Sequence, residues 1–238
     1  MKNPFKVLNK FDICLWATSV VAIVLAFSLS PNRDYFALAS SITGISALVF
    51  IVKGNVLGQF LVVIFAVLYG VVSYFFKYYG EMITYLGMSL PAAVCAIVSW
   101  LRHPYKDSAR VTVGTLNAKK INVVCFISAA VTVAFYFILR ALGTANLIVS
   151  TISVTTSMLA SCLTFLRSPF YGIAYSSNDI VLIVLWVLAT VNDIAYLPMV
   201  LCFSIFLIYD MYGFFSWSRM RKRQNEPESK STTEITEL

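Results

Sequence analysis

Eight long apolar segments follow one another along this chain of 238 residues, and they limit what it can fold into. A helix needs about 20 mostly apolar residues to cross the roughly 30 Å hydrocarbon core of a bilayer. The segments cover approximately residues 12–30, 35–52, 55–77, 80–101, 120–140, 144–166, 178–192 and 194–217. The seventh is the shortest, so a tilted or broken helix is the alternative there. We therefore predict an all-α integral membrane protein surrounded by the lipid bilayer.

The composition excludes an ordinary soluble enzyme, because 59% of the residues are hydrophobic and only 12% are charged. Soluble domains have roughly 45–50% apolar and about 25% charged residues. The formal net charge of +7 would favour nucleic acid as the partner of a soluble protein. Here the basic residues lie between the apolar segments rather than along one stripe, so we expect no nucleic-acid partner. The five cysteines lie inside apolar segments without CxxC spacing, which is typical of small hydrophobic residues rather than of a disulfide or zinc site.

The distribution of positive charge tests the number of spans. An even number of spans puts both ends of the chain on the same side of the membrane. With both termini in the cytoplasm, only Arg33, Lys77 and Arg140 of the 18 Lys and Arg residues fall outside. Cytoplasmic loops of membrane proteins are enriched in Lys and Arg. We therefore predict a multi-pass protein with eight spans and cytoplasmic termini.

A long basic connector, residues 102–120, divides the chain into comparable halves. One linker helix between two helix triplets leaves both triplets in the same orientation, so we expect two parallel three-helix bundles in a 3+1+3 order. In chain order we predict an N-terminal segment with an extra transmembrane helix, the first bundle, the basic loop with the linker helix, the second bundle and a disordered cytoplasmic tail. Their bounds are 1–34, 35–101, 102–143, 144–217 and 218–238.

The two predicted bundles end in similar residues, IVSWLR at 97–102 and FFSWSR at 214–219. An aromatic residue at the membrane interface followed by a positive anchor would explain either motif alone. Together with the matching helix order, the pair of motifs favours internal duplication.

No group of residues suited to catalysis stands out in the sequence. His103 is the only histidine, and it lies beside Arg102 without the carboxylate or further ligands that a catalytic or metal site needs. No GxxxxGK[ST] phosphate-binding loop occurs. We therefore expect neither an enzyme nor a cofactor. The hydroxyl-rich stretch 150–164 and the GxxxG formed by Gly54 and Gly58 are typical of close helix packing, with a polar pathway along 150–164 as the alternative.

Polar side chains inside the apolar segments are costly to bury and mark candidate binding positions. Gln59, Glu81, Asn192, Asp193 and Asp210 are the clearest, although interfacial solvation explains Glu81 and Asp193 at segment ends. Nearby aromatic residues offer flat faces for a ring-shaped or cationic solute. We predict that a substrate site includes Gln59, Tyr69, Tyr85, Trp186, Asn192, Tyr209 and Asp210.

Several short motifs resemble the PnuC family of vitamin transporters. They are KGNVLG before the third apolar segment, KYYGEM before the fourth, and YGFFSW followed by a basic stretch near the C-terminus. The likeness covers roughly residues 35–223. It implies uptake of nicotinamide riboside across the bacterial inner membrane, a fold related to the SWEET sugar transporters, and a homotrimer.

The resemblance is incomplete at the family's substrate motif, Trp-x-x-Trp-x-x-x-Asn. Trp186 matches the second Trp, but Ile183 and Thr190 occupy the positions of the first Trp and of the Asn. Thiamine and riboflavin, which relatives of this family carry, are therefore alternative substrates.

Nicotinamide riboside has a planar cationic ring and a polyhydroxyl sugar, so its site needs aromatic faces and amide or carboxylate groups. We expect Trp186 and Tyr69 to stack on the ring, and Gln59, Asn192 and Asp210 to supply hydrogen bonds and charge. No buried chain of carboxylates indicates proton coupling. The expected mechanism is facilitated diffusion by alternating access, with a separate kinase that retains the substrate as a charged nucleotide. The alternatives are a non-transporting membrane receptor or subunit and, disfavoured by the single histidine, a lipid-modifying membrane enzyme.

Overall fold

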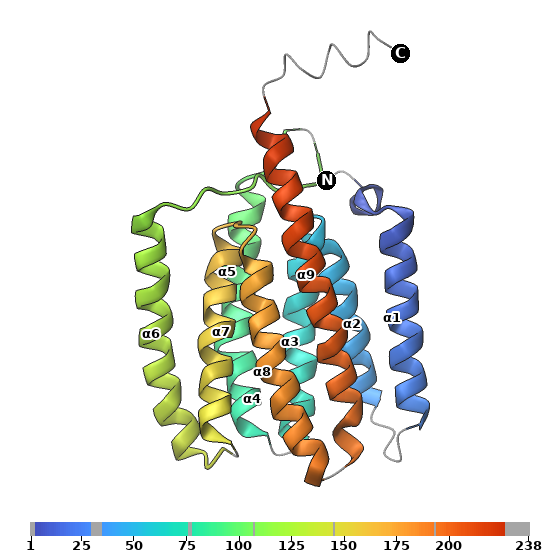
Figure 1. The fold of residues 1–238 in the computed structure, drawn as a ribbon, viewed down its shortest axis with the longest axis vertical. Coiled ribbons are helices and arrows are strands. Elements are labelled where there is room, and N and C mark those ends of the chain that lie inside the picture. The colour runs from blue at the N-terminus through green and yellow to red at the C-terminus, as the bar shows by residue number, and fades with distance from the viewer. Residues whose placement is uncertain are drawn as a thin grey trace.

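A computed structural model describes residues 3–29, 35–75, 78–106, 108–144, 146–192 and 194–226 of the chain. Within these residues, eight helical segments are long and apolar enough to cross a membrane, and no β-strand occurs. The predicted all-helical class and the number of spans are thus confirmed. In order, the elements are η1 (Pro4–Val7), α1 (Lys10–Leu29), α2 (Tyr35–Val52), α3 (Leu57–Phe75), α4 (Tyr79–Thr84), η2 (Tyr85–Ser89), α5 (Leu90–Leu101), α6 (Ala118–Ala141), α7 (Leu147–Phe165), α8 (Tyr171–Asn192), η3 (Ile194–Tyr196) and α9 (Leu197–Asn225) (Figure 1).

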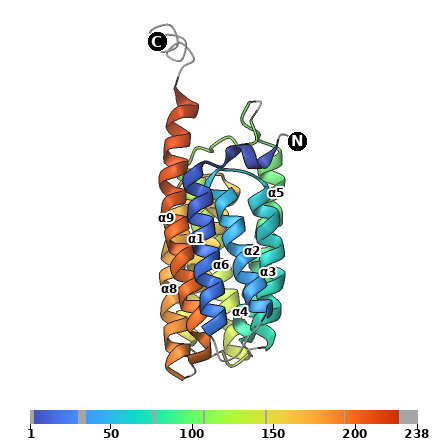
Figure 2. The same cartoon turned by 90° about the vertical axis from the view of Figure 1, so that its right-hand side faces the viewer.

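The helices run side by side, with η1 and the C-terminal end of α9 at the same end of the bundle, which we call the η1 end (Figures 1 and 2). We refer to α2, α3 and the composite span α4–η2–α5 as the first helical group, and to α7, α8 and α9 as the second. The two groups meet through contacts of α2 with α9 and of α5 with α7. At the margins, α1 packs on α2 and α9, whereas α6 packs on α7.

The marginal helix α1 is fastened near the η1 end by a buried ion pair. Asp12 accepts a hydrogen bond from the Tyr212 hydroxyl (2.8 Å), and its carboxylate lies 2.9 Å from Lys53 Nζ. Lys53 Nζ also donates to the Tyr212 hydroxyl oxygen at 2.9 Å. The other buried residues of α1 are Ser19 and Ile23. This polar contact therefore joins α1 to the end of α2 and to α9.

The seventh span is longer than the apolar pattern predicts. α8 begins at Tyr171, not near residue 178. Ser176, Asn178 and Asp179 lie inside this helix and are buried in protein. Their polarity lowers the local hydropathy without marking the membrane surface, and for this reason the predicted start was wrong.

The last helix also continues beyond its predicted end at 217. α9 reaches Asn225, so the expectation of disorder is wrong for residues 218–225. Met220 packs in a buried cluster with Val111, and the Gln224 side chain accepts from Val113 N (2.8 Å) and donates to Val111 O (3.1 Å). These contacts with the α5–α6 connector stabilise the extra turns. The predicted disordered tail otherwise falls on residues 227–238, which lie outside the described residues.

The fourth span contains one π-helical turn, η2, between α4 and α5. Pro91 in the first turn of α5 lacks a backbone N–H and cannot continue the regular α-helical hydrogen-bond pattern. A π turn is wider than an α turn and changes which side chains face inward, and such turns are frequent at functional sites. Tyr85 and Ser89, at the two ends of η2, both face the cavity described below.

The first Ser-Trp motif lies in α5 and bonds to the C-terminal end of α7. Ser99 Oγ donates to Phe165 O at 2.7 Å, and Trp100 Nε1 donates to Thr164 O at 3.0 Å. The last carbonyls of a helix have no partner within the helix. The end of the first helical group thus caps the first helix of the second group.

The second Ser-Trp motif, in α9, makes the reciprocal bonds. Ser216 Oγ donates to Val52 O and Trp217 Nε1 to Ile51 O, each at 2.8 Å, at the C-terminal end of α2. The rings of Trp217 and Trp100 also pack together, with centroids 5.3 Å apart. Both indoles are buried, so the interpretation as a lipid-facing aromatic belt is wrong for both.

The α5–α6 connector adds further bonds at the η1 end. Val111 N donates to Gly54 O in the α2–α3 loop (2.8 Å), and Gly114 N donates to Arg167 O in the α7–α8 loop (2.9 Å). Arg167 reaches back to the first group, because its guanidinium donates to Ser99 Oγ at 3.0 Å. Hydrogen bonds therefore link the two groups at this end.

Candidate functional site

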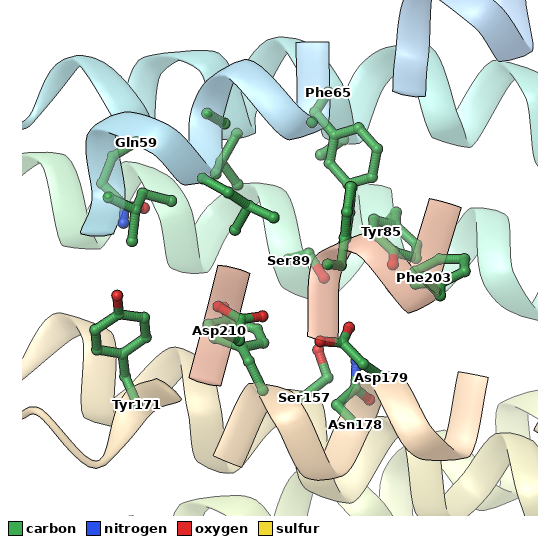
Figure 3. A pocket seen from close by; sticks show the side chains of 18 residues that line it. Gln59, Phe65, Tyr85, Ser89, Ser157, Tyr171, Asn178, Asp179, Phe203 and Asp210 are labelled. Carbon is green, nitrogen blue, oxygen red and sulfur yellow. The ribbon is translucent and has the colours of Figure 1, made fainter. Parts of the chain in front are cut away.

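A cavity of about 80 Å³ lies between the two helical groups (Figure 3). This volume has room for a few water molecules. Its walls come from α2, α3, η2, α7, α8 and α9, so it is a junction of both groups. The lining residues are Gly44, Ala47, Leu48, Ile51, Gln59, Val62, Phe65, Ala66, Tyr85, Ser89, Ser157, Tyr171, Tyr175, Asn178, Asp179, Phe203, Phe206 and Asp210.

Two carboxyl groups, Asp179 of α8 and Asp210 of α9, face this cavity (Figure 3). Each residue is 3% exposed, and the two side chains are close enough to interact electrostatically. Asp179 Oδ2 and Asp210 Oδ1 have no hydrogen-bond partner among the described residues. Among the described residues, a buried salt bridge joins Asp12 and Lys53, and it lies outside the cavity. Buried carboxylates are costly unless a cation or a shared proton compensates them. The pair can therefore share a proton or take a positively charged ligand.

Close helix approach brings the two carboxylates together. A Cβ at Gly172 would lie 2.5 Å from Asp210 O and 2.7 Å from Phe214 N, so this position accepts no larger residue without moving α9. Gly172 is the second residue of α8 and holds that helix against α9 at the level of Asp210. The glycine is thus needed for the close approach that places Asp179 and Asp210 in one cavity.

Hydroxyl groups of α7 orient Asn178, which lies beside Asp179. Asn178 Oδ1 accepts hydrogen bonds from Thr156 Oγ1 (2.9 Å) and Ser153 Oγ (3.3 Å). Ser157 of the same stretch lines the cavity. The hydroxyl-rich stretch therefore packs α7 against α8, as the first interpretation expects, and contributes one hydroxyl to the cavity wall.

Aromatic rings close the part of the cavity farther from the η1 end. The Tyr85 ring lies 4.3 Å from that of Tyr69 and 5.7 Å from that of Phe65, measured between centroids. Phe203 packs edge-on against Tyr69 at 6.1 Å. Toward the η1 end the wall is more polar, with buried Gln59 and the Tyr171 hydroxyl, which has no hydrogen-bond partner among the described residues. The cavity therefore has an aromatic part, a pair of carboxylates and a hydrogen-bonding part.

Three of the predicted site residues, Gln59, Tyr85 and Asp210, line the cavity. Tyr69 lies directly behind Tyr85. Tyr209 precedes Asp210 but lies close to Ser19 of α1, because successive side chains on a helix point in different directions.

The other two predicted residues lie farther along α8. Trp186 is outside the lining and packs against Tyr78 (5.1 Å) and Tyr196 (5.8 Å). Asn192 is the last residue of α8, and its side chain is outside the described part of the chain.

Sequence reasoning missed Asp179 and its neighbours. Tyr171, Tyr175 and Asp179 recur at intervals of four and therefore lie on one face of a helix. That spacing could have identified the polar face if the helix had been started at Tyr171. The expectation that the spans hold no group of buried carboxylates is wrong, since Asp179 and Asp210 are both buried and line the same cavity.

A second cavity of about 230 Å³ lies toward the opposite end of the bundle. It is lined by Glu81, Tyr78, Tyr196 and residues of the α6–α7 loop. Glu81 is 5% exposed, and its Oε2 has no hydrogen-bond partner among the described residues. The expected interfacial solvation of Glu81 is therefore wrong. A third buried carboxylate therefore lies next to aromatic rings, in this second cavity.

The chain is similar to proteins of known description. A family model described as nicotinamide mononucleotide transporter matches residues 34–219. A nicotinamide riboside transporter PnuC of Neisseria mucosa is 27% identical over 217 residues, which are 89% of this chain and 82% of that protein. Its counterpart in Haemophilus influenzae is 25% identical over 218 residues, covering 90% of this chain and 92% of that protein. A solved structure, described as the crystal structure of the vitamin B3 transporter PnuC, superposes with a TM-score of 0.79 at 25% identity and covers 92% of this chain and 94% of its own.

Proposed function

We propose that this chain, which belongs to the nicotinamide mononucleotide transporter family, carries nicotinamide riboside across the membrane through the cavity between its two helical groups. The observation that carries the proposal is the Asp179–Asp210 pair, buried and with no basic side chain among the described residues that line its cavity. The nicotinamide ring of the riboside is planar and carries one positive charge, so it can balance one of the two carboxylates, or the pair when the two share a proton. The two relatives described as nicotinamide riboside transporters support the same substrate.

The lining suggests a role for each part of the site. Tyr85 offers a ring face to the nicotinamide group, next to the carboxylates. Gln59 and Asn178 carry amide groups that can hydrogen-bond the ribose hydroxyls. Tyr69 supports Tyr85 from behind.

Two of the predicted site residues fit a path that leads to the cavity rather than the cavity itself. Trp186 and Asn192 lie along α8 toward the opposite end, where Glu81 faces the second cavity. We assign them to the outer part of the path, where a cation first meets a carboxylate among aromatic rings. Tyr209 belongs to the contact with α1.

The size of the central cavity requires movement during transport. Pockets for drug-sized ligands have about 300–1,000 Å³, whereas this cavity has about 80 Å³. The groups must therefore separate to admit the riboside. We infer the 3+1+3 order of parallel repeats from the exchanged Ser-Trp hydrogen bonds, since each group ends on the first helix of the other. Rocking of such repeats about a central site gives alternating access.

The proposed energetics need no ion gradient. A monovalent cation gains about 2.3 kcal/mol per 100 mV on entering a negative interior. Phosphorylation by a separate cytoplasmic kinase would then retain it. We place the η1 end, with both termini, in the cytoplasm of a bacterial inner membrane, and we propose a homotrimer, as the resemblance to the PnuC family implies.

Uptake into proteoliposomes tests the proposal. Vesicles with an imposed inside-negative potential and no proton or sodium gradient should accumulate labelled nicotinamide riboside, and excess thiamine or riboflavin should compete weakly. Accumulation that depends on an ion gradient would refute facilitated diffusion. Transport of thiamine or riboflavin in preference would change the substrate, and binding without flux would identify a receptor.

A further inference from the structure

An apolar groove separate from the transport cavity lies between α6 and the pair α5 and α7. It has a volume of about 510 Å³, and its walls include Ala92 and Cys95 of α5, Val123 and Ile127 of α6, and Met158 and Cys162 of α7. α6 packs on α7, and the groove fills the angle between α6 and α5. Because these helices are membrane spans, the groove lies at the depth of lipid chains.

The groove is bounded at the η1 end by positive charge. Lys119 and Lys120, in the first turn of α6, are among its lining residues, and no acidic residue is among those described there. Lys119 is exposed. Lys120 Nζ donates to Thr115 O at 2.7 Å, which uses one of its three donors. The first turn of a helix adds unpaired N–H groups and a partial positive charge. An apolar slot with a cationic mouth at the membrane surface matches a lipid with a negatively charged headgroup.

We propose that this groove binds one anionic phospholipid, with an acyl chain along the apolar walls and the phosphate against Lys119 and Lys120. The two lysines at the mouth of the groove attract a negatively charged headgroup, so the charge favours an anionic lipid over a second copy of the chain. The acyl chain is equally apolar in the bilayer, and therefore the lysines supply the selectivity. Near a membrane surface each basic residue strengthens the binding of anionic lipid roughly fivefold, or roughly thirtyfold for two.

The native cysteines provide a direct measurement. Cys162 lines the groove, whereas Cys125 lies on an exposed part of α6 outside it. Two variants, each keeping one of these cysteines with the other four replaced by alanine, are labelled with an apolar maleimide in detergent. We expect phosphatidylglycerol to slow labelling of Cys162 several-fold and phosphatidylcholine to have little effect. Labelling of Cys125 should respond to neither lipid.

Charge variants separate the proposal from its alternatives. Lys119→Gln with Lys120→Gln should raise the phosphatidylglycerol concentration needed for protection by roughly thirtyfold. The matched control, Lys222→Gln with Arg223→Gln at the end of α9, should leave it unchanged. Equal protection by both lipids, absence of protection, or protection that follows protein concentration would each overturn the proposal, the last in favour of a second copy. If the cysteine variants fold poorly, the thermal stability of the unmodified protein decides: phosphatidylglycerol should raise its melting temperature above that in phosphatidylcholine, and equal values would refute specific binding.

Discussion

The two helical groups are alike where they hold each other and unlike where they face the cavity. At the η1 end each contributes a Ser-Trp pair that bonds to the first helix of the other group. At the cavity the first group contributes mostly apolar and aromatic side chains with Gln59, whereas the second contributes both carboxylates. Two helical groups that are joined by similar contacts can therefore differ in charge at the cavity, with both carboxylates on one of them.

The placement of both carboxylates in one helical group suits a protein that carries a cation. On the proposed mechanism, Asp179 and Asp210 move together because they lie on the adjacent helices α8 and α9 of one group. The substrate can then keep its charge contacts while the apolar wall of the other group moves past it. Division of the carboxylates between the groups would break a buried ion pair in each cycle, at a cost of several kcal/mol.

The largest expected effect comes from removing the two tryptophans that join the helical groups. Trp100→Ala and Trp217→Ala each remove a buried indole and should lower the free energy of unfolding by about 3–5 kcal/mol. They also remove the indole donor from Thr164 O or Ile51 O, each of which keeps one backbone donor, Arg167 N or Gly54 N. Unfolding of the detergent-solubilised protein, followed by circular dichroism, measures the change.

Trp16→Ala is the matched control, because Trp16 is 38% exposed. It removes one exposed hydrogen bond, from Trp16 Nε1 to Ser46 Oγ, and should cost about 1–2 kcal/mol, less than the loss of either buried indole. If the three variants lose the same stability, the reciprocal contacts do not hold the groups together.

The next largest effect is expected from neutralising the two carboxylates of the second helical group. Asp179→Asn and Asp210→Asn should each weaken binding of nicotinamide riboside about tenfold to a hundredfold, since a contact with a charged group is worth about 1.5–3 kcal/mol. Isothermal titration calorimetry gives the dissociation constants. Glu226→Gln, at an exposed carboxylate, makes the same change of charge and should leave the affinity unaltered.

A neutral ligand makes the test of charge sharper. The reduced form of the riboside lacks the positive charge on its ring and should bind the unaltered protein more weakly than the oxidised form. In the two asparagine variants this preference should largely disappear. A preference that persists would show that the carboxylates do not contact the ring charge.

The fold was largely predictable from the sequence, and the reason is energetic. Long apolar segments have no stable place outside lipid, so hydropathy identified the spans, and the basic loops agreed with their number. The start of α8 was not predictable in this way, because hydropathy cannot separate a polar residue at the membrane surface from one buried in protein, as Asn178 and Asp179 are.

The cavity was predictable only in part. Gln59 and Asp210 stood out because a polar side chain in a span needs a partner. Tyr209 and Trp186 were expected in the site but lie outside the cavity lining, because the direction of their side chains depends on the rotation of α8 and α9 against their neighbours. Packing at positions such as Gly172 sets that rotation, and a single sequence does not show which atoms such a glycine approaches.

A smaller effect tests the neutral side of the cavity. Gln59→Leu keeps the approximate size of the side chain and removes a neutral hydrogen-bonding group, so it should weaken riboside binding about fivefold, or about 1 kcal/mol. The same titration measures it. A loss as large as that of Asp210→Asn would contradict the one-sided distribution of binding energy.

The smallest expected effects concern the serines beside the two tryptophans. Ser216→Ala removes one hydrogen bond, from Oγ to Val52 O, and should cost about 1 kcal/mol of stability. Ser99→Ala removes the bond to Phe165 O and also one of the acceptors of the Arg167 guanidinium, so it should cost slightly more. The excess stays small because Arg167 is only partly buried, and water can replace the lost acceptor.

Thermal denaturation of each variant, alone and in the Trp100→Ala background, separates the two contributions. Trp100 and Ser99 act on neighbouring carbonyls of α7, so their effects should be non-additive, whereas Ser216→Ala should add fully to Trp100→Ala. Additivity for both serines would mean that each bond acts alone and that the Ser-Trp pairs are not cooperative units joining the groups.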